Sequence, residues 1–248
     1  MLEIRNLMVF FENALALNDL SMEVNEGEIV GVIGSNSAGK TTLMNALSGL
    51  IIDMRIKEKR RGGERITVYG KIVFKGEDIT ETKPDVRVRK GIVLSRERHP
   101  IFRESSVMEN LKIAGYLRNT SEVKEGIEYA FGLFPALKNL SSRKAGFLSG
   151  GEQQMLAIGM ALVVKPTLLL LDEPLLGLSP MMQKTLVDAI SGLQKESGIT
   201  VVLSEQFARP VLPMIGRGYV IENGMLTLTG TGAELMGNPE IKAAYFGV

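Results

Sequence analysis

The chain contains 248 residues, and its 29 lysines and arginines nearly balance its 28 aspartates and glutamates, which gives no indication of a nucleic-acid partner. It has no cysteine and a single histidine, His99, which excludes a disulfide framework, a thiolate metal site and a multi-histidine metal centre. Because it shows no signal-peptide pattern and no apolar run of ~18 residues, we expect a cytoplasmic protein with one large α/β domain or a domain with an inserted lobe.

The N-terminal part of the chain is predicted to consist mostly of strands. Residues 2–11 and 19–24 have strand character, and residues 28–33 (EIVGVI) form a short apolar run that is typical of a buried strand. Residues 41–50 predict a helix with one apolar face. Strand character then returns at residues 66–74.

Residues 54–65 (MRIKEKRRGGER) lie between this helix and the following strand and are rich in charge. Charged side chains together with two consecutive glycines are typical of an exposed segment. We therefore predict a solvated hairpin loop here. A contact with anionic lipid headgroups is the alternative interpretation of the same residues.

The rest of the chain is first rich in helices, from about residue 104 to 165, and then alternates between strands and helices. The ranges 219–221 and 225–228 predict a hairpin around Asn223-Gly224, a pair that favours tight turns. Alternation of strands and helices predicts a parallel sheet with crossover helices. The predicted helices are 107–117, 121–134, 152–164 and 180–196, and the predicted strands are 168–171 and 199–203.

Residues 34–41 read G-S-N-S-A-G-K-T, the spacing of a phosphate-binding loop. A predicted strand precedes this loop and a predicted helix follows it, which is the context that the motif requires. Backbone N–H groups of such a loop and the helix N-terminus form an anion site. Lys40 then reaches the outer phosphates, and the hydroxyl of Thr41 is placed to bind Mg²⁺.

A second motif, residues 167–174 (TLLLLDEP), places two carboxylates at the end of a strand. Four consecutive leucines are typical of a parallel strand that is buried on both faces. Asp172 would leave this strand at its carboxyl end, where α/β sheets bind ligands, and could hold Mg²⁺. Glu173 could polarise an attacking water. The alternative is a pair of carboxylates that simply face solvent.

A third motif, residues 148–154 (LSGGEQQ), predicts the start of a helix. Ser149 and Glu152 have the spacing of a capping box. Gly150 and Gly151 are poor helix formers, each less favourable than alanine by roughly 1 kcal/mol. Two glycines at this position favour a close approach of another group to the backbone, and a phosphate is the natural candidate.

These three motifs, in this order, resemble the phosphate-binding loop, the signature and the second nucleotide motif of ABC-transporter ATPases, and the resemblance covers essentially the whole chain. Further segments are similar to the ATP-binding subunits of branched-chain amino-acid importers, in the subgroup with Glu-Gln rather than Glu-His after the sheet. These segments are Gly76-Glu77-Asp78-Ile79-Thr80, Leu176-Gly177-Leu178-Ser179-Pro180, Ser204-Glu205-Gln206, Gly230-Thr231-Gly232-Ala233-Glu234-Leu235 and Asn238-Pro239-Glu240.

The resemblance implies an α/β fold of the P-loop NTPase type, with a RecA-like core around a mostly parallel sheet. It also implies an N-terminal antiparallel β subdomain and a helical subdomain inserted at about residues 95–165 of a single ABC ATPase domain, 1–248. The implied cofactors are ATP and Mg²⁺. The implied partners are a second ABC ATPase subunit, identical or different, and transmembrane permease subunits at the inner face of the cell membrane.

The same resemblance assigns the site residues. Phe11 matches the aromatic residue that stacks on adenine, and Asp172 and Glu173 match the Mg²⁺ ligand and the catalytic glutamate. Glu97 matches, by its distance from Ile101-Phe102, the residue that contacts the metal and links the site to the membrane partner, and Gln206 matches the switch residue. The implied ATP-binding residues are Gly34, Ser35, Asn36, Ser37, Ala38, Gly39, Lys40, Thr41 and Thr42, together with Ser149, Gly150 and Gly151, which would contact ATP on the opposite subunit of a head-to-tail dimer.

Several positions depart from the family pattern. Ser37 stands where the family has glycine, so its backbone must avoid left-handed strain. Gln206 replaces the switch histidine and cannot titrate, so it could only donate or accept hydrogen bonds. Residues 54–65 resemble an insertion, and Met160 replaces an arginine. We interpret His99 as a surface residue rather than a proton carrier.

The sequence predicts an ATP-hydrolysing importer subunit, and two other functions remain open. One is a nucleotide-gated module with weak hydrolysis, which Gln206 and Ser37 favour. The other is an ABC-type ATPase of nucleic-acid repair or translation, which the balanced charge disfavours. A GTPase is disfavoured because the chain has no N-K-x-D segment.

Overall fold

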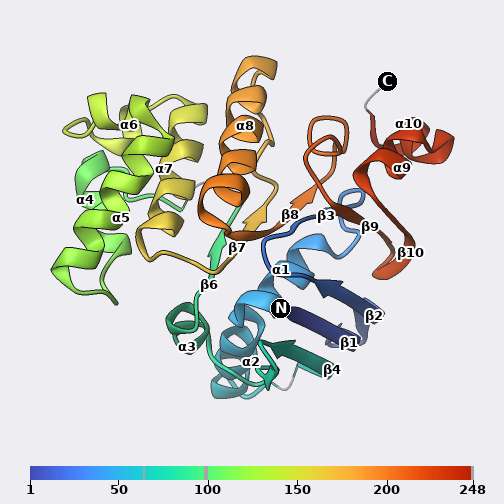
Figure 1. Ribbon diagram of the computed structural model, residues 1–248. Coiled ribbons are helices and arrows are strands. Elements are labelled where there is room, and N and C mark those ends of the chain that lie inside the picture. Colours follow the sequence, from blue (N-terminus) through green and yellow to red (C-terminus); the bar gives the residue numbers. More distant parts are fainter. Residues whose placement is uncertain (64, 98–99, 247–248) are drawn as a thin grey trace.

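The computed structural model describes residues 1–63, 65–97 and 100–246. Two sheets organise these residues: an antiparallel sheet in the order β2-β1-β4-β5, and a larger sheet in the order β10-β9-β3-β8-β7-β6. Figure 1 shows the antiparallel strands at the lower right of the molecule and a group of helices on the opposite side. The predicted α/β fold with an antiparallel β subdomain and an inserted group of helices is confirmed.

The antiparallel sheet is built around β1. Buried and more exposed residues alternate along much of β1. Asn6, at φ 49°, interrupts this alternation at the point where the pairing of β1 with β2 is irregular. The strands are β1 (Leu2–Phe11), β2 (Ala14–Val24), β4 (Ile66–Phe74) and β5 (Glu77–Asp78). The predicted bounds of β1 and β4 are confirmed, whereas β2 starts five residues before the predicted residue 19.

The larger sheet has a parallel centre and one antiparallel edge. Strands β9, β3, β8, β7 and β6 run parallel, and β10 pairs antiparallel with β9. The Asn223-Gly224 turn joins β9 to β10, with φ of 49° and 80°, so the predicted hairpin is confirmed. The strands are β3 (Ile29–Ile33), β6 (Ile92–Ser95), β7 (Leu168–Asp172), β8 (Thr200–Glu205), β9 (Arg217–Glu222) and β10 (Met225–Gly230).

The four leucines of β7 are consecutive because both faces of this strand are buried. Leu169 and Leu171 belong to one hydrophobic core, and Leu168 and Leu170 belong to another on the opposite face of the sheet. Helix α1 (Lys40–Ser48) and the antiparallel sheet cover the second face, while α7 (Gly150–Val163) and α8 (Pro180–Ser197) cover the first. Burial on both faces fixes the strand that carries Asp172 at its end.

The predicted hairpin loop at residues 54–65 is wrong for most of its length, because residues 50–60 form helix α2 (Leu50–Arg60). Gly49, at φ 81°, ends α1 and allows the chain to start a second helix at once. Ile51 and Ile52 are buried and anchor the first turn of α2. The later turns are charged and face solvent, with Lys57 paired to Asp53 at 3.4 Å. A buried first turn therefore determines the structure of a segment that composition alone describes as a loop.

Helices occupy the chain between β6 and β7, at the left of Figure 1 beside α8. The predicted helix 107–117 ends early, at Ala114, because the next turn is interrupted at Gly115, where Val123 packs against the backbone. The helices of this segment are α4 (Val107–Ala114), α5 (Thr120–Leu133), α6 (Pro135–Asn139), a 3₁₀ turn (Ala145–Phe147) and α7.

The remaining helices are α3 (Pro84–Arg89) before β6, and α9 (Gly232–Gly237) and α10 (Pro239–Tyr245) at the C-terminal end. None of the helices in the described ranges has both the length and the apolar character that a bilayer-spanning segment needs. His99 lies outside the described residues, so its predicted surface position stays a prediction.

Candidate active site

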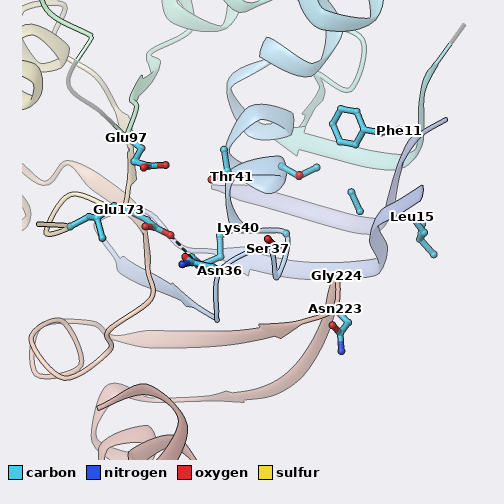
Figure 2. A pocket seen from close by; sticks show the side chains of 14 residues that line it. Phe11, Leu15, Asn36, Ser37, Lys40, Thr41, Glu97, Glu173, Asn223 and Gly224 are labelled. Atoms are coloured by element: carbon cyan, nitrogen blue, oxygen red, sulfur yellow. Dashed lines mark ion pairs between the residues drawn. The ribbon is translucent and has the colours of Figure 1, made fainter. Parts of the chain in front are cut away.

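The loop between β3 and α1 wraps around the amino group of Lys40. Lys40 begins α1 and is only 3 % exposed. Its Nζ donates to the carbonyl oxygens of Gly34 and Ser35, both at 2.8 Å, and lies 3.0 Å from Oε1 of Glu173. Figure 2 shows this ion pair as a dashed line between Glu173 and Lys40. The cation is thus held where the loop meets the end of β7.

The glycines of this loop are required by backbone contacts with neighbouring strands. A Cβ on Gly34 would lie 2.4 Å from the carbonyl oxygen of Ile221, and one on Gly39 would lie 2.9 Å from that of Ala16. Gly39 also has φ of 111°. The loop is therefore pressed between β2 and β9, which fixes its shape before any ligand binds.

Ser37 occupies the left-handed region, with φ of 64°. The strain that the sequence analysis raised for a serine at this position is therefore present, because a Cβ disfavours this region. The Ser37 side chain is exposed at the cavity and makes no hydrogen bond described for the structure that would offset the strain.

We expect Ser37→Gly to raise the free energy of unfolding by up to about 1 kcal/mol, since it removes left-handed strain that exceeds the added entropy of glycine in the unfolded chain. Ser35→Gly is the matched control, because Ser35 lies in the same loop but outside the left-handed region. That variant should lose about 0.5–1 kcal/mol. Urea unfolding of the nucleotide-free protein measures both, and equal losses in the two variants would contradict this prediction.

Asp172 lies beside Thr41 and Ser204. Its Oδ1 accepts a hydrogen bond from Ser204 Oγ at 2.7 Å and lies 3.4 Å from Thr41 Oγ1. Burial raises the pKa of Asp172, although the hydrogen bonds from Ser204 and Thr41 oppose this effect. The buried carboxylate of Asp172 and the neighbouring exposed hydroxyl of Thr41 are oxygen ligands of the kind that Mg²⁺ prefers. These two residues fit a magnesium ion that takes its other ligands from water and phosphate.

Glu173 follows directly, in a strained and buried turn. Its φ is 47°, its side chain is 8 % exposed, and its N–H lies 3.1 Å from the carbonyl oxygen of Ser204. Non-glycine residues in the left-handed region persist only where their surroundings hold them, and such residues cluster at functional sites. The backbone and the ion pair with Lys40 together aim the carboxylate at the loop.

Sequence reasoning missed Ser204 and Glu205, which appeared only as part of a family-like segment. Both lie at the carboxyl end of β8, adjacent to Asp172 and Ile33 in the neighbouring strands. Burial raises the pKa of Glu205 to about 8. Their position is the sequence signal that could have identified them, because they are polar residues at the end of an apolar strand, and such strand ends bind ligands in α/β sheets.

A cavity of about 790 Å³ lies beside these groups and is lined by Lys40, Thr41 and Glu173 among others. Figure 2 shows Glu97 and Glu173 at one side of it and Phe11 and Leu15 at the other. Predicted residues that line the cavity are Phe11, Asn36, Ser37, Gly39, Lys40, Thr41, Thr42, Glu97 and Glu173, and residues that the sequence analysis did not assign to a site are Leu15, Ala16, Leu176, Asn223 and Gly224.

The hairpin turn at Asn223-Gly224 reaches the cavity because backbone hydrogen bonds hold it there. The N–H of Gly224 donates to the carbonyl oxygen of Ala38 at 2.9 Å, and its own carbonyl oxygen accepts from Asn18 at 2.8 Å. Ala38 itself is buried beneath the loop. The sequence predicted this turn correctly, but only the sheet order brings it to the phosphate-binding loop.

Comparison with known proteins now decides the family. Residues 17–176 match the family model described as ABC transporter. The chain belongs to this family. As an ATP-binding cassette of the ABC type, it binds nucleotide and is an ATPase.

Full-length relatives of this ABC cassette agree with that assignment. The chain is 38% identical over 247 residues to the high-affinity branched-chain amino acid transport ATP-binding protein BraG of Pseudomonas aeruginosa, covering 100% of both chains. It is 34% identical to the probable branched-chain amino acid transport ATP-binding protein LivF of Archaeoglobus fulgidus, covering 94% of this chain and 92% of the relative. A solved ATP-binding cassette of an ABC transporter, in its ADP conformation, matches with a TM-score of 0.83 at 26% identity, covering 100% and 99%.

The signature residues of the cassette lie at the start of α7, away from the residues that line the cavity. The predicted capping box is confirmed: Ser149 Oγ accepts from the N–H of Glu152, and the Glu152 carboxylate accepts from the N–H of Ser149. A Cβ on Gly151 would lie 2.4 Å from Met182 Cε, whereas one on Gly150 would meet nothing within 4 Å. Met182 of α8 thus packs against Gly151, whereas Gly150 is open, and the predicted approach of a phosphate to the two glycines stays a prediction.

Two further predicted residues occupy different positions relative to the cavity. Glu97 follows β6 and lines the cavity, and its charge contributes to the raised pKa of Asp172, although burial is the main cause. Gln206 follows β8, is half-buried and does not line the cavity. The cassette thus gathers Glu97 with Lys40 and Thr41 but leaves Gln206 outside this group.

Proposed function

We propose that this ABC ATPase is the energy-supplying subunit of an importer of branched-chain amino acids. The observation that supports it best is the arrangement at Lys40, whose ammonium is held between the carbonyls of the loop and Glu173 while Thr41 and Asp172 meet beside it. Lys40, Thr41 and Glu173 line one cavity, and Asp172 lies directly beside Thr41, which supports a site for phosphate and a metal ion. The substrate class is that named for the relatives BraG and LivF.

The chain's own groups bind ATP in the proposed site. The exposed loop around Asn36 surrounds the phosphates with backbone N–H groups, and Lys40 turns from its carbonyl partners toward them. Phe11, at the far side of the cavity, stacks on the adenine ring. Thr42 lines the same cavity one residue after Thr41, at the positive N-terminal end of α1.

Magnesium in this site would be held by Thr41 and Asp172, with Glu97 close to it. When bound, the ion neutralises charge on the phosphate oxygens. Ser204 keeps Asp172 oriented through its 2.7 Å hydrogen bond. Glu173 lies at the edge of the same cavity and accepts the proton of the attacking water.

We further propose that the active form is a dimer in which each subunit completes the site of the other. The open position at Gly150 and the side chain of Ser149 would contact ATP on the opposite subunit. Gln206 would reach the site only in that assembly, by hydrogen bonding. The chain would act as one domain, 1–248, whose helical part at about 95–165 contacts permease subunits at the inner face of the cell membrane.

The test is transport by the assembled system. The chain is co-expressed with the permease subunits and binding protein encoded beside it and reconstituted in vesicles, and uptake of labelled leucine, isoleucine and valine is measured. Uptake should require ATP and Mg²⁺ on the cassette side and should be lost with Lys40→Ala, because the outer phosphates lose their cation. Uptake that persists in Lys40→Ala, or ATP hydrolysis that no branched-chain amino acid stimulates, would contradict the proposal.

The position of Gln206 outside the cavity supports a second candidate, a nucleotide-gated module with weak hydrolysis of its own. In that case a different ATPase subunit would perform most of the chemistry. Turnover by the purified homodimer distinguishes the two functions. Multiple turnovers by the chain alone would exclude the second.

A further inference from the structure

Glu205 makes a buried contact to the turn that carries Glu173. Its side chain is 3 % exposed at the end of β8, and its Oε1 accepts the backbone N–H of Leu175 at 2.8 Å. The carbonyl oxygen of the same residue accepts the N–H of Gly34 at 3.3 Å. Glu205 therefore joins the first residue of the phosphate-binding loop to the residue two positions after Glu173.

The turn at residues 173–175 depends on β8 for its backbone hydrogen bonds. Pro174 has no N–H, so the turn has two backbone donors. Ser204 accepts from the N–H of Glu173, and Glu205 accepts from the N–H of Leu175. The Oγ of Ser204 also accepts the N–H of Glu173, at 3.2 Å, and the Glu205 side chain is the acceptor on the other side of Pro174. Because Glu173 has φ of 47°, its conformation needs such anchors on both sides.

The surroundings of Glu205 favour a neutral acceptor. Burial is the main reason that its pKa is raised to about 8, and the charge of Glu173 raises it further while Lys40 opposes this. A third negative charge beside Glu173 and Asp172 would compete for Lys40. A neutral carboxyl still accepts the N–H of Leu175, so the hydrogen bond does not require an ionised side chain.

We propose that Glu205 is a positioning residue for ATP hydrolysis, whose side-chain hydrogen bond to Leu175 holds Glu173 in the orientation that polarises water. This inference rests on the proposed function of Glu173. It predicts an effect on turnover rather than on nucleotide binding, because the Gly34 contact uses the backbone of Glu205 and survives a change of side chain.

The experiment measures kcat and KM for ATP in the full chain with Glu205→Leu and Glu205→Gln. Leucine removes the acceptor, and we expect kcat to fall by roughly ten-fold or more, since small misplacements of a catalytic group are costly, while KM stays near the parental value. Glutamine keeps an acceptor of the same length and should restore most of kcat. Thr200→Val, at the opposite end of β8, is the matched control and should leave kcat unchanged.

A double-mutant cycle separates positioning from general damage to the fold. In the Glu173→Gln background, Glu205→Leu should cause no further loss of the residual rate, because Glu205 acts only through Glu173. An additive loss in the double variant, parental kcat in Glu205→Leu, or equal losses in the leucine and glutamine variants would each overturn the inference. The proposed function fails separately, if Glu173→Gln itself hydrolyses ATP as fast as the parent.

If Glu205→Leu does not fold, as judged by circular dichroism, Glu205→Met provides the same loss of the acceptor with an unbranched side chain. Comparison of Glu205→Met with Glu205→Gln then gives the result. A methionine variant that folds and keeps the parental kcat contradicts the inference, and one that loses kcat while the glutamine variant retains it supports the inference.

Discussion

Glu173→Gln should lower the kcat of ATP hydrolysis by roughly 10²-fold or more, the usual contribution of a general base. In the nucleotide-free chain, Glu173 holds the ammonium of Lys40 at 3.0 Å in a buried ion pair. The substitution removes the carboxylate that we propose as the acceptor of a proton from water. It also weakens the hold on Lys40, so the amino group becomes more available to phosphate.

Loss of the carboxylate lowers the rate of hydrolysis, whereas release of Lys40 favours nucleotide binding, so the variant should show opposite changes in the two quantities. ATP should bind as tightly as to the parent or more tightly, as measured by calorimetry, while steady-state hydrolysis is nearly lost. Glu26→Gln, at an exposed position in the turn before β3, is the matched control and should change neither quantity. Parental hydrolysis by Glu173→Gln would show that another group takes the proton.

Arg87→Leu should produce the largest loss of stability, about 3–5 kcal/mol in the free energy of unfolding. Arg87 lies in α3, is fully buried, and its guanidinium donates to five backbone carbonyls. These are the carbonyl oxygens of Thr82 at 2.9 Å, Ala46 at 2.6 Å, Leu47 at 2.8 Å, Ile79 at 2.5 Å and Thr80 at 3.0 Å. Leucine would leave several of these carbonyls without a partner in a site that water does not reach.

The buried guanidinium of Arg87 also explains why a glycine stands in the turn between α1 and α2. A Cβ on Gly49 would lie 2.9 Å from Nε of Arg87, so the guanidinium occupies the space that only a glycine leaves free. Ala46 and Leu47 belong to the last turn of α1, whose carbonyl oxygens attract a cation, and that of Ala46 also accepts the N–H of Gly49 at 3.3 Å. Burial lowers the pKa of Arg87 to about 10, which still leaves it charged at neutral pH.

Urea unfolding of Arg87→Leu, Arg87→Lys and Arg89→Leu tests this account. Lysine keeps the charge but offers a single amino group in place of the planar fork, so its loss should be intermediate. Arg89 is exposed on the same helix, and Arg89→Leu should change stability by no more than about 0.5 kcal/mol. Equal stability of Arg87→Leu and Arg89→Leu would contradict the assigned contribution of the five hydrogen bonds.

Some features of this protein follow from local sequence alone. The capping box of Ser149 and Glu152 and the turn at Asn223-Gly224 depend on residues within a few positions of one another. Their physical causes are hydrogen bonds and backbone preferences between near neighbours, so they survive any change of sheet order.

Other features depended on contacts between distant segments. Residues 50–60 form a helix because Ile51 and Ile52 find a buried core, although their local composition is that of an exposed segment. Gly151 packs against Met182 of α8, which is distant in the sequence. Neither partner is visible in the local sequence.

The residues of the candidate active site also fall into these two groups, those that the sequence indicates and those that only the tertiary structure brings to the site. The sequence predicted Lys40, Thr41, Asp172 and Glu173 as residues of the site, since motif spacing indicates which residues end a strand or begin a helix. Only the tertiary structure decided that β8 lies between β3 and β7. This strand order brings Ser204 against Asp172, more than thirty residues away, and Glu205 against Gly34, more than a hundred and sixty residues away. Strand order and register arise from the burial of both faces of the whole sheet, and no local pattern encodes them.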